Sequence, residues 1–308
     1  MSAPATSSNN APNIPFTDDD LPGVHSAANK ASDRGQKRYL SLSRTRFIAL
    51  LIAAIAGALG IYHGSFDFFG LVIMISFVVA AVAEAALIYF QPERNWYSGR
   101  AIAESTKTLA WRFAVQGEPF GPDLSEEDAE QRLGQRIRDV LKRGQDRIDI
   151  DPESDVVTDT MRNLRRASFE IRRASYVLYR TQDQRKWYSD NAQQNARRAT
   201  FWRWALLIGE VSAVVIAILA FGRDFTFDFA GMIAALVAAG AGWLAIKQHS
   251  QLASAYRVAT GELALQANTL KSMDDQHWPQ AVADAEEAIS REHTMWLASR
   301  GQEPLGKV

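Results

Sequence analysis

The sequence predicts an all-α membrane protein, with four transmembrane helices arranged as two hairpins that carry long cytoplasmic helical extensions. Two observations support this fold class. Apolar residues are concentrated in four blocks separated by polar segments, and basic residues flank each pair of blocks. The average composition, 47% hydrophobic, conceals this division. The distribution of apolar residues along the chain therefore decides the fold class.

The block at residues 68–90 is the clearest span, because its one charged side chain is that of Glu84. A helix of this length extends roughly 34 Å at about 1.5 Å per residue, slightly more than the hydrocarbon core of a bilayer. The alternative is a buried helix of a soluble protein. That helix would be unusually long, and three similar blocks accompany it.

The first block, residues 47–62, is short for a span. Arg44 and Arg46 precede it and can extend their charged ends to the membrane surface. Tyr62 can lie among the lipid headgroups at the other end. These flanking residues make a span of this length workable.

The third and fourth blocks, residues 204–221 and 227–246, repeat the same plan. Basic residues flank this pair as they flank the first: Arg197, Arg198, Arg203 and Lys247. The positive-inside rule then places both chain termini and the segments between the pairs in the cytoplasm. We expect an integral inner-membrane protein with several spans, for which the lipid bilayer is the first partner.

A short string recurs where each hairpin begins its second helix. Residues 66–70 read FDFFG, and residues 227–231 read FDFAG. Both hairpins run in the same direction through the membrane, so the string indicates a parallel duplication of a two-helix unit.

The predicted organisation has four parts. Residues 1–37 are rich in Ser, Ala, Asn, Asp and Pro and are expected to form a disordered tail. Residues 38–150 and 151–300 form the two units, and residues 301–308 form a C-terminal tail. Between the hairpins we expect a helix capped by Ser125, and a second helical stretch with a start at Ser168 that continues into the third span.

No enzymatic site is evident in the sequence. The chain has no cysteine, and its five histidines show no metal-ligand spacing. Phosphate-binding loops and nucleophile elbows are also lacking. A net charge of −1 gives no bulk attraction to nucleic acid. We expect neither catalysis nor a cofactor, a bound metal or a nucleic-acid partner.

Two intramembrane carboxylates, Glu84 and Glu210, lie near the cytoplasmic ends of their spans. A carboxylate in hydrocarbon is unfavourable unless it is protonated, paired or facing water. In an oligomer the two residues could line a cation-selective path. The alternative is that they reach Arg203, Lys247 or water and only set the helix register.

Small residues recur at a spacing of four in two spans: Ala53 and Gly57 in the first, and Gly231, Ala235 and Ala239 in the fourth. Such faces allow helix backbones to approach closely. They could serve packing within one bundle or contacts between subunits of a homo-oligomer, and both alternatives stay open.

Aromatic and basic residues also suggest membrane contacts. Trp202, Trp204 and Trp243 are expected to anchor the cytoplasmic boundary. The basic run from Arg162 to Arg173 could bind anionic lipid, or it could form one solvated or ion-paired helix face.

Two segments resemble a known family. Residues 91–120, QPERNWYSGRAIAESTKTLAWRFAVQGEPF, resemble the segment after the first helix pair in the SLATT families, the two-transmembrane effector domains associated with SMODS nucleotide synthases and SLOG proteins. Residues 179–204, YRTQDQRKWYSDNAQQNARRATFWRW, resemble the approach to the membrane in a second SLATT subtype. The motifs that carry the resemblance are Trp111-Arg112, Gly117-Glu118-Pro119-Phe120, Asp183-Gln184 and Trp187-Tyr188.

The resemblance implies a membrane effector of a prokaryotic conflict system, in antiviral defence. Such an effector would form pores or perturb the membrane as an oligomer when a cytoplasmic partner or nucleotide signal reports infection. The alternative is a non-conducting scaffold whose cytoplasmic helices bind a partner. A secondary transporter is less well supported, because the spans hold few polar residues and no proline-broken helix.

Overall fold

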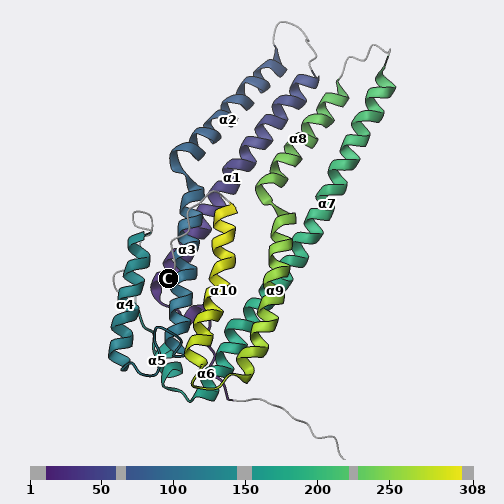
Figure 1. Cartoon of the computed structure of the whole chain (residues 1–308). Helices are drawn as coiled ribbons and strands as arrows, with labels where there is room; N and C mark the ends of the chain where they lie inside the picture. The colour runs from purple at the N-terminus through teal and green to yellow at the C-terminus, as the bar shows by residue number, and fades with distance from the viewer. Residues whose placement is uncertain (1–11, 60–66, 144–154, 222–227, 300–308) are drawn as a thin grey trace, which may run out of the picture. The chain divides into compact units, whose positions relative to one another are not determined.

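The structure is a computed structural model that describes residues 12–59, 67–143, 155–221 and 228–299, with side chains described up to residue 290. These residues form helices, and no strand occurs among them (Figure 1). The all-α fold class is therefore confirmed. Some predicted segments lie outside the described residues: residues 1–11 and 301–308 of the tails, and residues 60–62 and 227 of the spans.

The described residues form the following elements, given in chain order. They are η1 (Asp18–Asp20, a 3-10 turn), α1 (Gly23–Leu59), α2 (Phe68–Phe90), α3 (Pro92–Ala114), α4 (Glu126–Arg143), α5 (Asp159–Arg166), α6 (Phe169–Ser175), η2 (Tyr176–Gln182, a π-helical segment), α7 (Asp183–Ala220), α8 (Phe229–Lys247), α9 (His249–Ser272) and α10 (Trp278–Ser299).

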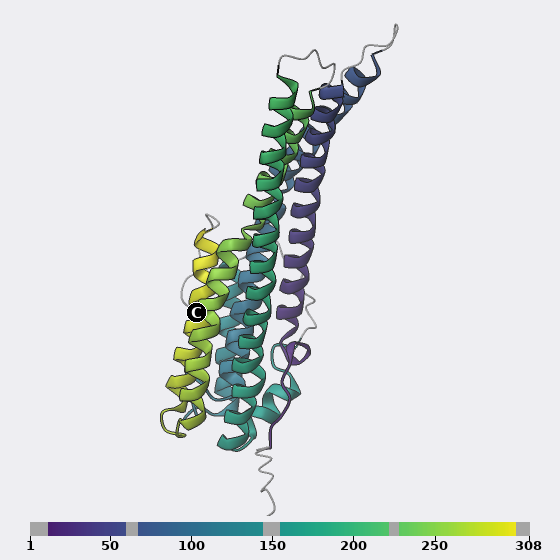
Figure 2. The same cartoon turned by 90° about the vertical axis from the view of Figure 1, so that its right-hand side faces the viewer.

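Among the described residues, four helical stretches are long and apolar enough to cross a membrane, and each covers most or all of one predicted span. The predicted span at residues 68–90 coincides with α2. The third span lies at the end of α7, which is one continuous helix, as the sequence predicts (Figure 2). The helix predicted after Ser125 is α4, whose Asp128 backbone N–H donates to the Ser125 hydroxyl.

The described chain divides into two compact units. The first, called the span unit, comprises Arg34–Arg94 and Asn191–Ala255. The second, called the core unit, comprises Met1–Asp33, Asn95–Asp190 and Tyr256–Val308. Both predicted hairpins contribute to the span unit, and the polar segments from both halves of the sequence contribute to the core unit.

In the span unit, α1 and α2 pack in opposite directions. A methyl group at Gly57 would lie 4.0 Å from Ile73, near one end of the pair. At the other end the Arg38 guanidinium lies 4.0 Å from the centre of the Phe90 ring. Because residue numbers rise along α1 as they fall along α2, the two helices form the predicted hairpin.

The helix α8 lies against both α7 and α1. Glycines at the contacts leave room for the side chains of these two neighbouring helices. A methyl group at Gly240 would come within 3.1 Å of Leu206 on α7. A methyl group at Gly242 would come within 2.9 Å of the Phe47 ring on α1. The neighbour order in the span unit is therefore α2, α1, α8 and α7 (Figure 1).

The repeated FDFxG string has a common structural role in the two hairpins. The Asp67 carboxylate accepts a hydrogen bond from the Gly70 N–H at 2.7 Å, and Asp228 accepts one from the Gly231 N–H at 2.8 Å. A methyl group at either glycine would collide with its capping carboxylate. The string therefore encodes the same N-terminal cap for α2 and α8.

Aromatic rings organise the interior of the core unit. Phe16 packs edge-on against Trp111 with 4.5 Å between ring centroids. Trp111 packs against Tyr176 at 5.6 Å, and Tyr176 against Trp278 at 5.7 Å. These rings come from the N-terminal segment, α3, η2 and α10, so one core joins distant parts of the chain.

The N-terminal segment differs from the predicted disordered tail over residues 12–37. Gly23 starts α1, and the Phe16 side chain is 1% exposed. The Ile14 N–H donates to the Ser175 hydroxyl at 2.8 Å, and the Thr158 hydroxyl donates to the Asp20 carbonyl at 2.7 Å. The segment has few large apolar residues, but the core buries several of them, so average composition was a poor guide to its order.

Candidate functional site

Glu84 and Glu210, the two carboxylates that the sequence places in predicted spans, have different environments within the span unit. Glu84 on α2 forms an ion pair with Arg46 on α1, and both side chains are partly exposed. Arg203 and Lys247 are the partners that the sequence suggests, whereas the structure places Arg46 beside Glu84. The Glu84 carboxylate is thus compensated within its own hairpin.

Glu210 lies on an exposed face of α7. Its neighbours one helical turn away, Leu207 and Val214, are also exposed. In the described part of the chain, no ion pair or hydrogen bond reaches the Glu210 carboxylate. This carboxylate is therefore presented on an apolar surface without a partner from the described residues.

The predicted packing residues lie mainly on faces turned toward neighbouring helices. Ala53 is buried on α1, and Gly57 faces Ile73 of α2. On α8, Ala235 and Ala239 are partly buried, while Gly231 serves the cap with Asp228. A role in contacts between subunits stays a prediction for these residues.

The three predicted interface tryptophans do not share one environment. The Trp202 ring would lie 3.4 Å from a methyl group at Gly240, so it packs toward α8. Trp243 lies beneath the ammonium group of Lys247, which is 5.1 Å from its ring centroid. Trp204 is 60% exposed. The exposure of Trp204 suits a membrane anchor, and this role stays a prediction.

The core unit contains a buried ion pair that the sequence does not predict. Arg180 of η2 donates from Nε and Nη2 to the two carboxylate oxygens of Glu286 on α10, at 2.8 and 2.7 Å. Thr108 and Tyr176 also donate hydroxyl hydrogen bonds to this carboxylate, at 2.9 and 3.0 Å. The Arg180 and Glu286 side chains are 1% and 0% exposed.

A sequence signal for this pair exists in α10. Val282, Ala285 and Ile289 are buried residues spaced along one helical face, and Glu286 lies on that face. A charged residue inside an apolar stripe indicates a buried partner. The partner itself could not be inferred, because Arg180 lies about a hundred residues away.

The basic run from Arg162 to Arg173 is engaged in contacts within the core unit. Arg165 is 3% exposed and donates to the carbonyl oxygens of Phe113 and Phe120, at 3.0 and 2.8 Å. Burial lowers the pKa of the Arg165 guanidinium. Arg162 and Arg166 pair with Glu130 and Glu126. The ion-paired alternative therefore describes this run better than a lipid-binding face.

The Gly117–Phe120 motif joins the end of α3 to the start of α10. The Glu118 N–H donates to the Pro279 carbonyl at 2.9 Å, and the Trp278 indole donates to the Val115 carbonyl at 2.8 Å. A methyl group at Gly117 would collide with Val282. Glycine is thus required here by the close approach of α10.

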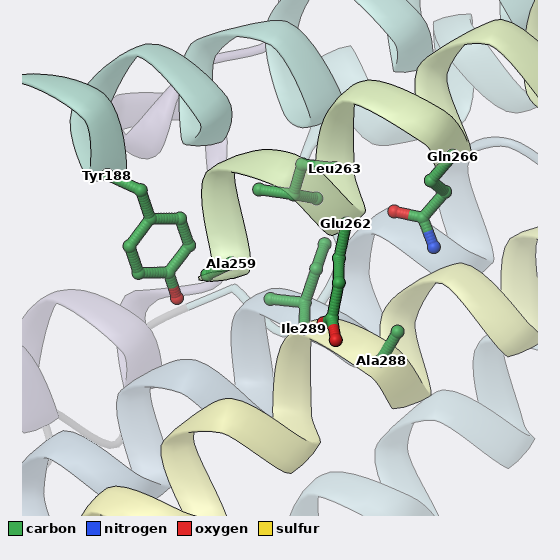
Figure 3. Close-up of a pocket in the computed structure, with 7 residues that line it drawn as sticks. All are labelled: Tyr188, Ala259, Glu262, Leu263, Gln266, Ala288 and Ile289. Atoms are coloured by element: carbon green, nitrogen blue, oxygen red, sulfur yellow. The ribbon is translucent and has the colours of Figure 1, made fainter. Parts of the chain in front are cut away.

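A small pocket lies among α7, α9 and α10 in the core unit (Figure 3). Its volume is about 40 Å³, which admits water-sized molecules and lies far below the volume of a ligand pocket. A nucleotide needs far more room, so this pocket is not a nucleotide site. The residues lining it are Tyr188, Ala259, Glu262, Leu263, Gln266, Ala288 and Ile289.

The described residues contain no group of three or more acidic, histidine or cysteine side chains that could hold a metal ion. The polar features of the structure are therefore ion pairs, caps and buried hydrogen bonds.

Two family models match the chain. Residues 22–173 match the SMODS and SLOG-associating 2TM effector domain 3, and residues 176–296 match the SMODS and SLOG-associating 2TM effector domain 1. The matched ranges begin earlier and meet later than the predicted units, 38–150 and 151–300. No curated protein and no solved structure matches the chain.

The matched domains are two-transmembrane membrane effectors of conflict systems, which agrees with the four apolar helices of this structure. Each matched range contains two of these helices, α1 and α2 in the first and the apolar parts of α7 and α8 in the second. The chain belongs to the SLATT family and consists of two SLATT effector domains in tandem.

Proposed function

We propose that this chain is a multi-pass inner-membrane effector that assembles as a homo-oligomer and opens a cation-conducting path after a cytoplasmic signal. Both chain ends and the core unit lie in the cytoplasm in this proposal, as the positive-inside rule favours. A partner protein or a nucleotide supplies the signal.

The observation that carries the proposal is the environment of Glu210. Its carboxylate lies on an exposed, apolar face of α7 with no partner among the described residues. An ionised side chain facing lipid costs about 3 kcal/mol on insertion scales, and more by other measures. A water-filled path between subunits would relieve this cost and would use the carboxylate to attract cations.

Glu84 has a structural role in this proposal, in contrast to Glu210, which lines the conducting path. Its charge is balanced by Arg46 in the same hairpin. Neutralising Glu84 should therefore disturb the α1–α2 pair, whereas neutralising Glu210 should alter ion flow. The same pairing favours a second candidate function, a non-conducting scaffold, because it assigns one of the two carboxylates to helix packing.

Ion flux through liposomes containing the purified full-length chain tests the proposal. We expect wild-type protein to conduct K⁺ in preference to Cl⁻ once a candidate partner or cyclic nucleotide is added as the trigger, and to conduct little without one. Glu210→Gln should reduce the K⁺ preference at least several-fold, while Glu127→Gln, at an exposed position on α4, should leave it unchanged.

Two results would count against a pore. Equal K⁺ and Cl⁻ flux in wild type and Glu210→Gln would remove the role of this carboxylate. Absence of flux under every trigger, with a membrane-inserted and folded protein, would favour the scaffold.

A further inference from the structure

Three helices meet where α8 ends and α9 begins, all within the span unit. The corner residue Gln248 adopts a left-handed conformation with φ 49°, and its N–H donates to the Leu244 carbonyl at 2.9 Å. Asn195 of α7 is hydrogen-bonded to His249, the first residue of α9, with 2.6 Å between Oδ1 and Nδ1. The corner is thus held against α7.

Contacts along α8 also place α1 and α7 at this corner. Phe47 of α1 packs at Gly242, and Leu206 of α7 packs at Gly240. Because both helices run opposite to α8, residues before Phe47 and before Leu206 lie toward the end of α8. Arg44 precedes Phe47 by about one turn, and Arg198 precedes Leu206 by about two.

Three cations therefore converge from three helices: Arg44 on α1, Arg198 on α7 and Lys247 at the end of α8. The positive charges of Arg198 and Arg44 both act on the Lys247 ammonium group. Like charges repel one another, so an anion between them would stabilise the arrangement.

Within the described chain, these three cations lack the carboxylate partner that several other basic residues have. Arg46, Arg162 and Arg166 each pair with a carboxylate. Over the ranges that the structure describes, Arg44, Arg198 and Lys247 form no ion pair, and the Lys247 ammonium lies over the Trp243 ring. The charge at the corner is thus uncompensated by the described residues.

The position of the corner identifies the kind of anion that it fits. Here the apolar helix α8 gives way to the polar helix α9, so in a membrane the corner lies at the depth of the lipid headgroups. Guanidinium groups bind phosphate through paired hydrogen bonds, and the N-terminus of α9 adds a favourable dipole. Basic pockets between spans bind anionic headgroups by this chemistry.

We propose that Arg44, Arg198 and Lys247 form a binding site for the phosphate group of an anionic phospholipid. The site links α1 of the first SLATT domain to α7 and α8 of the second. The positive-inside rule alone requires basic residues on one side of the membrane, and it does not require three of them on different helices to share a corner without carboxylates.

Native mass spectrometry of the detergent-purified full-length chain, titrated with phosphatidylglycerol or phosphatidylcholine, tests the site. Wild-type protein should prefer phosphatidylglycerol. Replacing all three residues with glutamine should weaken this binding by about fivefold for each charge removed. The control R136Q/R138Q/R185Q removes three exposed arginines of the core unit and should retain the preference.

Further measurements separate loss of charge from loss of folding, and a lipid ligand from free phosphate. R44K/R198K keeps the charges and should retain most of the lipid preference, while circular dichroism and elution volume report folding of every variant. If the triple glutamine variant does not fold, R198Q alone should still show the fivefold loss. Inorganic phosphate should displace the lipid only at far higher concentration.

Three results of these binding measurements would overturn the proposal. Equal losses in the triple variant and its control would reduce the effect to net charge. A wild-type chain that binds both lipids alike would remove the site. Binding of inorganic phosphate more tightly than phosphatidylglycerol would assign the corner to a soluble anion instead of a lipid.

Discussion

Replacing Glu286 with leucine should severely destabilise the core unit. The substitution leaves the Arg180 guanidinium charged and 1% exposed without its carboxylate. Breaking a buried ion pair from one side costs about 3–5 kcal/mol. The hydroxyl groups of Tyr176 and Thr108 also lose their acceptor, at about 1–3 kcal/mol each where they stay buried and unpaired.

These losses are not additive, because the three donor side chains share one carboxylate. A total of about 5 kcal/mol is a conservative expectation, and it is comparable to the whole stability of many domains. For a folded unit of this size the midpoint of thermal unfolding should fall by about 10–20 °C. Adding Arg180→Met should recover part of the loss, because the double variant no longer buries an unpaired charge.

The assay is thermal unfolding of the detergent-purified full-length chain, followed by circular dichroism, with hydrogen exchange to locate the loss. Glu127→Leu provides a matched control on an exposed position of α4. Protection should fall first in η2 and α10. A midpoint within about 2 °C of wild type for Glu286→Leu, or a double variant less stable than the single one, would refute the reasoning.

Three further predictions concern local features. Gly117→Ala should cost about 1–3 kcal/mol through overpacking against α10, whereas Gly261→Ala, which meets open space, should be neutral or slightly stabilising in the same unfolding assay. Asp228→Ala should remove the cap of α8 at a cost of about 1 kcal/mol and raise hydrogen exchange at the start of that helix. Burial acts to raise the pKa of Asp18, but the charge and hydrogen bond of Lys107 outweigh it and lower the pKa. The contact therefore contributes stability above about pH 4 and loses it in more acid solution, which hydrogen exchange of residues 16–24 would report; protection independent of pH down to 3 would contradict it.

The sequence was sufficient for the apolar helices, for the cap at Ser125 and for the helix start after Ser168, although the Ser168 side chain makes no capping hydrogen bond. It was insufficient for the N-terminal segment, where a few apolar residues such as Phe16 find a distant core. The same limit applies to Arg180 and Glu286. Their pairing depends on the tertiary arrangement of η2 and α10, which no local pattern encodes.

The candidate site shows the limit most clearly. Glu84 and Glu210 are equivalent in sequence terms, as single carboxylates in apolar blocks at similar depth. The structure distinguishes them by neighbours alone, since Arg46 lies beside Glu84 and exposed apolar residues flank Glu210. Likewise, the sequence does not show which basic residues have a carboxylate partner, because this depends on the tertiary arrangement of the helices.

The aromatic core has a consequence for how the tandem can be divided. Phe16 precedes the first matched range and Trp111 lies within it, whereas Tyr176 and Trp278 belong to the second. A gene split between the two ranges would yield fragments that each lack half of their shared interior. We expect neither polypeptide to become protease-resistant until it meets the other.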